Sequence, residues 1–129
     1  MKDKAKILIV EDEGIQAMGL EETLYNAGFE VTGIADNGKD ALDMISKEAV
    51  DLVIMDIHIK GEMDGIDTAW KIRALSNDLP IIYLTAYVDQ DTVKRAEATS
   101  PAAYITKPYR HLQLLNSIQD AINKAHKTG

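Results

Sequence analysis

The stretch ILIVEDE (Ile7–Glu13), four aliphatic residues followed by three acids, decides how this chain folds. A short, continuous run rich in β-branched residues is typical of a strand buried on both faces of a parallel sheet. Leu52–Met55 and Ile81–Leu84 have the same character, and weaker runs lie at Phe29–Ile34 and Ala102–Ile105. We therefore predict five strands.

Amphipathic segments separate these strands. Apolar residues at helical spacing predict helices around residues 17–27, 41–45, 66–75, 93–96 and 114–125. Strand and helix alternate along the whole chain, which predicts an α/β fold with helices on both faces of a parallel sheet. No linker or shift in composition divides the sequence, so we expect one domain over residues 1–129, with its core at about 6–125.

The amino-acid composition excludes several classes of partner and of functional site. The chain has 129 residues, 21 acidic and 14 basic, a formal net charge of −7 and no cysteine. The negative balance argues against nucleic acid or an anionic membrane as a direct partner. The absence of cysteine excludes disulfides, thiol nucleophiles and cysteine-ligated metals. The first residues are charged and the aliphatic runs are too short to span a membrane, so we expect a cytoplasmic protein.

Polar or charged residues follow four of the predicted strands: Glu11, Asp12, Asp56, Thr85 and Lys107. The carboxyl ends of parallel strands share one edge of the sheet, where the functional crevice lies. Clustered carboxylates repel one another unless a cation neutralises them. An all-oxygen set favours Mg²⁺, while the threonine and the lysine supply a donor and a positive charge for phosphoryl oxygens. The pattern predicts Mg²⁺-assisted phosphoryl transfer with a carboxylate nucleophile.

Each of these residues also has a simpler interpretation on its own. The acids after the first strand favour a helix N-terminus, Asp56 suits a turn or a cap, and Lys107 alone would be a solvated surface lysine. His58, His111 and His126 lack the spacing of metal ligands. The joint occurrence at successive strand ends favours a phosphoryl site over these separate interpretations.

The same residues resemble the response-regulator receiver domain, the phospho-acceptor module of two-component signalling, as in chemotaxis regulators. The resemblance runs from about Lys6 to Ala125. It rests on the stretch at 7–13, on Asp56 after Leu52–Met55, and on the motifs Met63-Asp64-Gly65, Thr85-Ala86 and Lys107-Pro108. It implies a flavodoxin-like (βα)5 three-layer sandwich, with a five-stranded parallel sheet in the order 2-1-3-4-5.

The resemblance also implies roles for the acidic edge. Asp56 is the phospho-acceptor and takes a phosphoryl group from the phosphohistidine of a sensor histidine kinase. Glu11 and Asp12, together with Asp56 and the backbone carbonyl of His58, hold Mg²⁺. Lys107 pairs with the phosphoryl oxygens.

A conformational switch is implied as well. Thr85 moves towards the phosphoryl group, the small Ala86 leaves room for it, and Tyr104 swings inward in response. The bond before Pro108 is cis and aims the preceding lysine at the site. The change reaches the fourth helix, fifth strand and fifth helix, where receivers of this family dimerise or meet partners. Such a chain is a signalling switch that catalyses only its own phosphorylation and dephosphorylation.

The chain departs from the family pattern in its loops. The loop over residues 57–62 lacks a common proline and is one residue longer, and Ser100-Pro101 replaces a usual Gly-Ala pair. His58 and Tyr87 occupy positions that vary between family members and tune the lifetime of the phosphoryl group. We predict that the bulky Tyr87 restricts the attacking water and slows dephosphorylation.

Other functions fit the sequence less well. A haloacid-dehalogenase-like phosphatase needs a second acid two residues after its nucleophile, where His58 stands. A flavodoxin-like or dinucleotide-binding module would place glycines or hydroxyls, not acids, after the first strand. A receiver-like domain that is never phosphorylated usually lacks one of the key residues. The output stays open between a protein that acts alone through protein contacts and a piece of a longer regulator or hybrid kinase.

Overall fold

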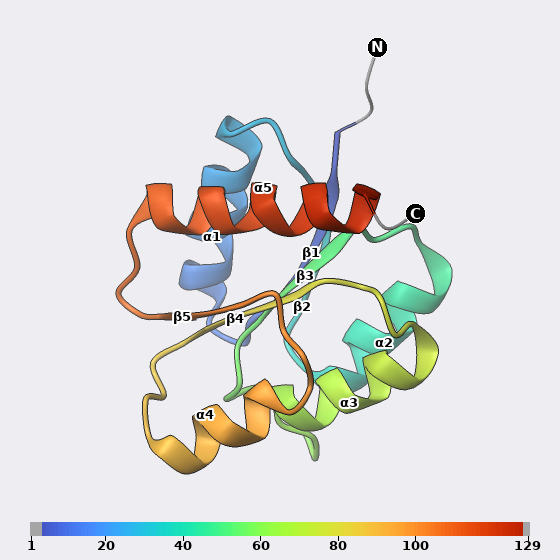
Figure 1. Ribbon diagram of the computed structural model, residues 1–129, viewed down its shortest axis with the longest axis vertical. Coiled ribbons are helices and arrows are strands. Elements are labelled where there is room, and N and C mark those ends of the chain that lie inside the picture. The colour runs from blue at the N-terminus through green and yellow to red at the C-terminus, as the bar shows by residue number, and fades with distance from the viewer. Residues whose placement is uncertain (1–3, 128–129) are drawn as a thin grey trace.

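The computed structural model describes residues 4–127 and contains the expected five-stranded sheet. All neighbouring strands are parallel, and their order is β2-β1-β3-β4-β5 (Figure 1). The strands are β1 (Lys6–Val10), β2 (Glu30–Ala35), β3 (Leu52–Met55), β4 (Ile81–Thr85) and β5 (Ala103–Thr106). The predicted strand positions and order are confirmed.

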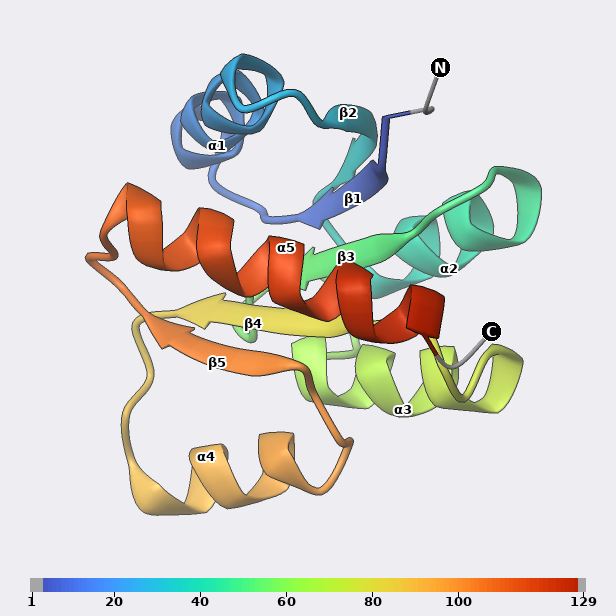
Figure 2. The same cartoon turned by 45° about the horizontal axis from the view of Figure 1, so that its top comes forward.

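Five helices cover the sheet in the three layers implied by the resemblance. They are α1 (Gly14–Asn26), α2 (Gly38–Lys47), α3 (Gly65–Leu75), α4 (Gln90–Glu97) and α5 (His111–Lys127). Helices α1 and α5 lie on one face of the sheet, and α2, α3 and α4 lie on the other (Figure 2). Asn37, Asp64 and Asp89 each cap the helix that follows, by accepting a hydrogen bond from the backbone N–H three residues on.

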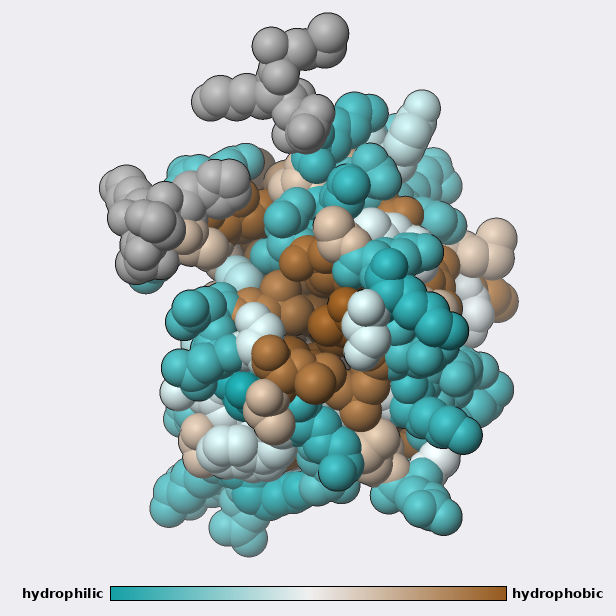
Figure 3. Space-filling model, turned by 90° about the vertical axis from the view of Figure 1, so that its right-hand side faces the viewer, coloured by the Kyte–Doolittle hydropathy of each residue, from teal (hydrophilic) through white to brown (hydrophobic). Residues whose placement is uncertain are grey.

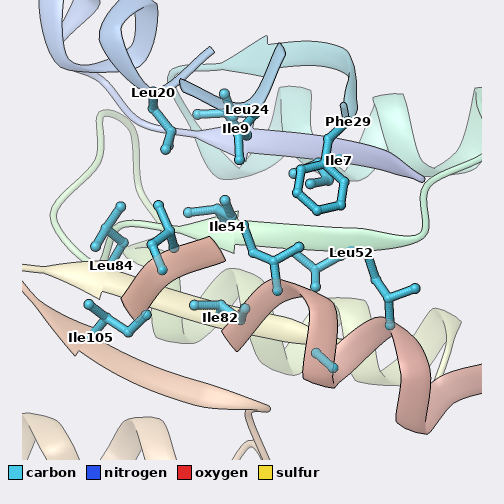
Figure 4. Packing of buried hydrophobic residues seen from close by; sticks show 14 of the residues in the cluster. Ile7, Ile9, Leu20, Leu24, Phe29, Leu52, Ile54, Ile82, Leu84 and Ile105 are labelled. Atoms are coloured by element: carbon cyan, nitrogen blue, oxygen red, sulfur yellow. The ribbon is translucent and has the colours of Figure 1, made fainter. Parts of the chain in front are cut away.

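The central strands account for the two hydrophobic cores. Every residue of β3 and β4 is buried, as expected for strands covered on both faces. Alternate residues of each strand point to opposite faces. One set packs under α1 and α5 (Figure 4), with Ile9, Ile54 and Ile82 at its centre. The other set packs under α2, α3 and α4. The sheet is therefore a rigid base for residues at its carboxyl edge.

The surface is mixed in character. Figure 3 shows apolar side chains gathered in the middle of one face and surrounded by hydrophilic ones. Among large apolar side chains, Ile15, Met18, Trp70 and Leu112 are more than half exposed. Within residues 4–127, no helix is long and apolar enough to cross a membrane.

The turn between α4 and β5 contains an unusual backbone conformation. Ser100 has a φ of 58°, in the left-handed region that favours glycine. A left-handed conformation costs a residue with a Cβ about 1–2 kcal/mol. The Arg73 guanidinium holds the turn, because it donates to the carbonyls of Thr99 (2.8 Å) and Ser100 (3.1 Å). Helix α3 thereby fixes the start of the last strand.

Candidate phosphoryl-transfer site

The strand register places the predicted site residues at one edge. Val10 pairs with Met55, so the residues that follow them, Glu11 and Asp56, lie side by side. The Asp56 N–H donates to the carbonyl of Val10 at 2.9 Å. On the other side of β4, Lys107 follows β5, and its N–H donates to the carbonyl of Thr85 at 2.8 Å. Strand ends far apart in sequence thus form one site.

The Lys107 ammonium joins the two acids. Its Nζ donates to Glu11 Oε1 at 2.6 Å and to Asp56 Oδ2 at 2.9 Å. The three side chains are only 18%, 7% and 11% exposed, in the order Lys107, Glu11 and Asp56. Little water screens these ion pairs, so each is stronger than an exposed one.

The pKa shifts agree with this geometry. Burial raises the pKa of Glu11, the hydrogen bond from Lys107 opposes that effect, and the charge of Asp56 adds to it. Burial alone would lower the pKa of Lys107, but its hydrogen bonds to Glu11 and Asp56, together with the negative charges of these two acids, outweigh burial and raise that pKa. Lys107 therefore stays protonated at neutral pH. With both acids ionised, the three groups carry one net negative charge, which favours a further cation.

The backbone around Asp56 is held tightly. Its Oδ1 accepts hydrogen bonds from the N–H groups of Ile57 (2.7 Å) and His58 (3.4 Å). The N–H of Gly65 donates to the Ile57 carbonyl at 2.7 Å. A Cβ at Gly65 would clash with the Asp56 carbonyl and lie 2.8 Å from the Ile57 Cα. Glycine at this position lets the start of α3 approach the loop over residues 57–62, which follows Asp56 and is called the acceptor loop below.

The predicted switch residues form a chain of contacts beside the acids. Thr85 is fully buried at the end of β4, and the next residue, Ala86, is exposed. The Tyr87 hydroxyl lies 2.9 Å from His58 Nδ1, and the two rings are stacked. Tyr104 donates from its hydroxyl to the Tyr87 carbonyl at 2.7 Å. The loop after β4 is therefore tied both to the acceptor loop and to β5.

Pro108 and Asp12 lie at the same edge of the sheet. The peptide bond between Lys107 and Pro108 is cis, as the resemblance implies. Asp12 is half-buried and follows Glu11. Within the described part of the chain, no three acids or histidines lie close enough together to hold a metal ion, so the Mg²⁺ ligand set stays a prediction. The oxygen donors of the edge are nevertheless the type that Mg²⁺ prefers.

Sequence reasoning missed one residue of the site. Gln16, in the first turn of α1, accepts a third hydrogen bond from Lys107 Nζ through its Oε1. The rule that directs attention to strand ends passes over a residue inside a helix. The signal that would have found it is structural: the first turn of a helix after a strand faces the same edge as the strand end.

Comparison with known proteins identifies the family. A family model described as the response regulator receiver domain matches residues 7–119. The chain belongs to this family. Receiver domains are signalling switches of two-component systems that accept a phosphoryl group and generally bind Mg²⁺ at their acidic site. In homologues they interact with histidine kinases and output domains.

Individual relatives agree with this assignment. Transcriptional regulatory protein PdtaR of Mycobacterium tuberculosis is 37% identical over 119 residues, which span 92% of this chain but only 57% of that protein. Sporulation initiation phosphotransferase F of Bacillus subtilis is 34% identical over 92% of this chain and 91% of that protein. The solved receiver domain of a modulated diguanylate cyclase from Desulfovibrio desulfuricans G20 has a TM-score of 0.91 at 35% identity, and covers 98% of this chain and 100% of its own.

The close approach at Gly65 generates a prediction for this receiver domain. Gly65→Ala should lower the free energy of unfolding by about 1–3 kcal/mol, because the added methyl group forces the acceptor loop away from α3. Gly19→Ala, in the middle of α1 with no atom near the new Cβ, should instead raise it by up to about 1 kcal/mol. Urea denaturation of both variants measures the difference. Equal effects of the two substitutions would contradict the packing described.

Proposed function

We propose that this receiver domain is a phospho-acceptor switch in which Asp56 takes a phosphoryl group from the phosphohistidine of a sensor histidine kinase, in a Mg²⁺-dependent reaction. The observation that carries the proposal is the ammonium of Lys107 at 2.9 Å from Asp56 Oδ2. A half-buried cation held against a carboxylate at the edge of a sheet suits a site that receives additional negative charge.

The transfer itself needs little covalent machinery. An oxygen of Asp56 attacks phosphorus, the bond from phosphorus to the imidazole nitrogen breaks, and the electron pair stays on that nitrogen. The product is an acyl phosphate. Lys107 neutralises charge on the phosphoryl oxygens, and the backbone N–H groups at Asp56 Oδ1 keep the carboxylate oriented.

A divalent cation fits the donor set. Mg²⁺ would be held by Glu11, Asp12, Asp56 and the carbonyl of His58, since all of these donors are hard oxygens. The negative charges of the three acids also outnumber the single positive charge of Lys107. When bound, the metal supplies further neutralisation of the phosphoryl oxygens. Lys107 would then exchange part of its contact with the acids for contact with the phosphoryl group.

The signal would leave the site through Thr85, Tyr104 and Lys107. Thr85 is buried next to the site, and Tyr104 is hydrogen-bonded to the loop that follows Thr85. A shift of that loop towards a phosphoryl group would change the α4-β5-α5 face.

We further propose that this face contacts an output domain or protein, or a second copy of the chain. The protein would act in the cytoplasm without direct contact with nucleic acid or membrane. The chain would catalyse only its own phosphorylation and dephosphorylation.

Intact-protein mass spectrometry tests the acceptor assignment. Incubation with acetyl phosphate and Mg²⁺ should add one phosphate, and a chelator should prevent the addition. Asp56→Asn should take up none while it stays folded by circular dichroism. Adduct formation in Asp56→Asn would contradict the assignment. A folded wild-type chain without any adduct would instead favour a receiver-like binding domain.

The contact between Tyr87 and His58 generates a second prediction. We expect Tyr87→Ala to speed decay of the acyl phosphate about threefold to tenfold, because the ring and its hydrogen bond no longer restrict the attacking water. Val88→Ala changes the adjacent side chain, which is 69% exposed, and should leave the decay unchanged. Loss of the phosphate adduct with time, followed by mass spectrometry after removal of acetyl phosphate, gives both rates. An unchanged rate in Tyr87→Ala would refute this role.

A further inference from the structure

The Lys107 ammonium has as many acceptors around it as it has protons to donate. An ammonium carries three N–H groups, and Nζ lies within hydrogen-bond distance of Glu11 Oε1, Asp56 Oδ2 and Gln16 Oε1. Two of these acceptors are carboxylates at the ends of β1 and β3. The third is a neutral amide on α1.

The three acceptors differ in what else they do. Under the proposed function, Glu11 and Asp56 serve as ligands of a divalent cation, and Asp56 also becomes an acyl phosphate. Each of those events draws a carboxylate oxygen away from the lysine. Gln16 has neither task, because a neutral amide oxygen is a weaker partner for Mg²⁺ than a carboxylate and is no nucleophile.

Gln16 is also well placed to keep its position. It lies in the first turn of α1, and the next residue, Ala17, is buried together with Leu20 and Leu24 against the sheet. The helix is therefore fixed relative to the strand ends, although the Gln16 side chain is exposed. Glu11, Gln16 and Lys107 line one cavity of about 340 Å³ between α1 and the segment after β5.

We propose that Gln16 is a positioning residue: its amide oxygen holds the Lys107 ammonium at the phosphoryl-binding position when the carboxylates are engaged by metal and phosphoryl group. This inference rests on the proposed function, since it requires both ligands at the site. Without Gln16, the freed N–H of Lys107 would turn to water, and the lysine would sample other rotamers at the cost of its contact with the phosphoryl group.

The test uses beryllofluoride, a tetrahedral mimic of a phosphoryl group, with saturating Mg²⁺. Gln16→Met keeps the length of the side chain and removes the acceptor, and should weaken beryllofluoride binding about threefold to tenfold. The affinity for Mg²⁺ alone should change less than twofold. Thr23→Val is the matched control: it alters another residue of the same cavity, whose hydroxyl donates to the Gly19 carbonyl, and should bind both ligands as the wild type does.

A spectroscopic readout separates positioning from a general effect on the fold. The ¹⁵N signal of the Lys107 ammonium should be visible in the beryllofluoride complex of the wild type and of Thr23→Val, where its protons are held. It should broaden or vanish in Gln16→Met. Wild-type affinity and an intact signal in Gln16→Met would overturn the inference and leave the proposed function standing. A wild-type chain that binds Mg²⁺ but no beryllofluoride would overturn the proposed function and the inference with it.

Discussion

The contact of one ammonium with two nearly buried carboxylates is the constraint on which the site depends. Glu11 and Asp56 follow adjacent strands, so the parallel register forces their charges together. Lys107 comes from β5, two strands away from β3, which is roughly 10 Å across the sheet. Its long side chain must cross the end of β4, where Thr85 is buried and Ala86 is small. The ends of β1, β3 and β5 are therefore coupled through the side chain of a single lysine.

The excess of acids over bases at the site favours the binding of a cation, but it makes the folded domain less stable. Two acids and one base leave an excess negative charge at a site with little solvent, and burial raises the pKa of Glu11. A better-balanced cluster would be more stable but would have less affinity for a metal or for a group that arrives with one. The apolar strands beneath the site compensate for this cost, because they are buried on both faces. Gly65 also stabilises the site, since only glycine allows α3 to pack against the acceptor loop.

Most of the fold and of the site could be predicted because both follow from local patterns. Continuous β-branched runs identify the central strands. Because the carboxyl ends of parallel strands share one edge of the sheet, Glu11, Asp56, Thr85 and Lys107 are then expected at one place. Gln16 escaped this reasoning because its role depends on how α1 is rotated against the sheet. The contact between Tyr87 and His58 depends on the shapes of two loops, which no periodicity encodes. The sequence shows a serine in the turn before β5, but its positive φ is set by tertiary contacts with Arg73.

A double-mutant cycle between Lys107 and Asp56 tests the central interaction most directly. The free energy of unfolding would be measured by urea denaturation, in buffer with chelator, for the wild type, Lys107→Met, Asp56→Asn and the double variant. We predict a favourable coupling energy of about 1–3 kcal/mol, because each single substitution breaks the same poorly solvated ion pair. Effects that add to within about 0.3 kcal/mol would contradict the claim that this lysine holds the site together.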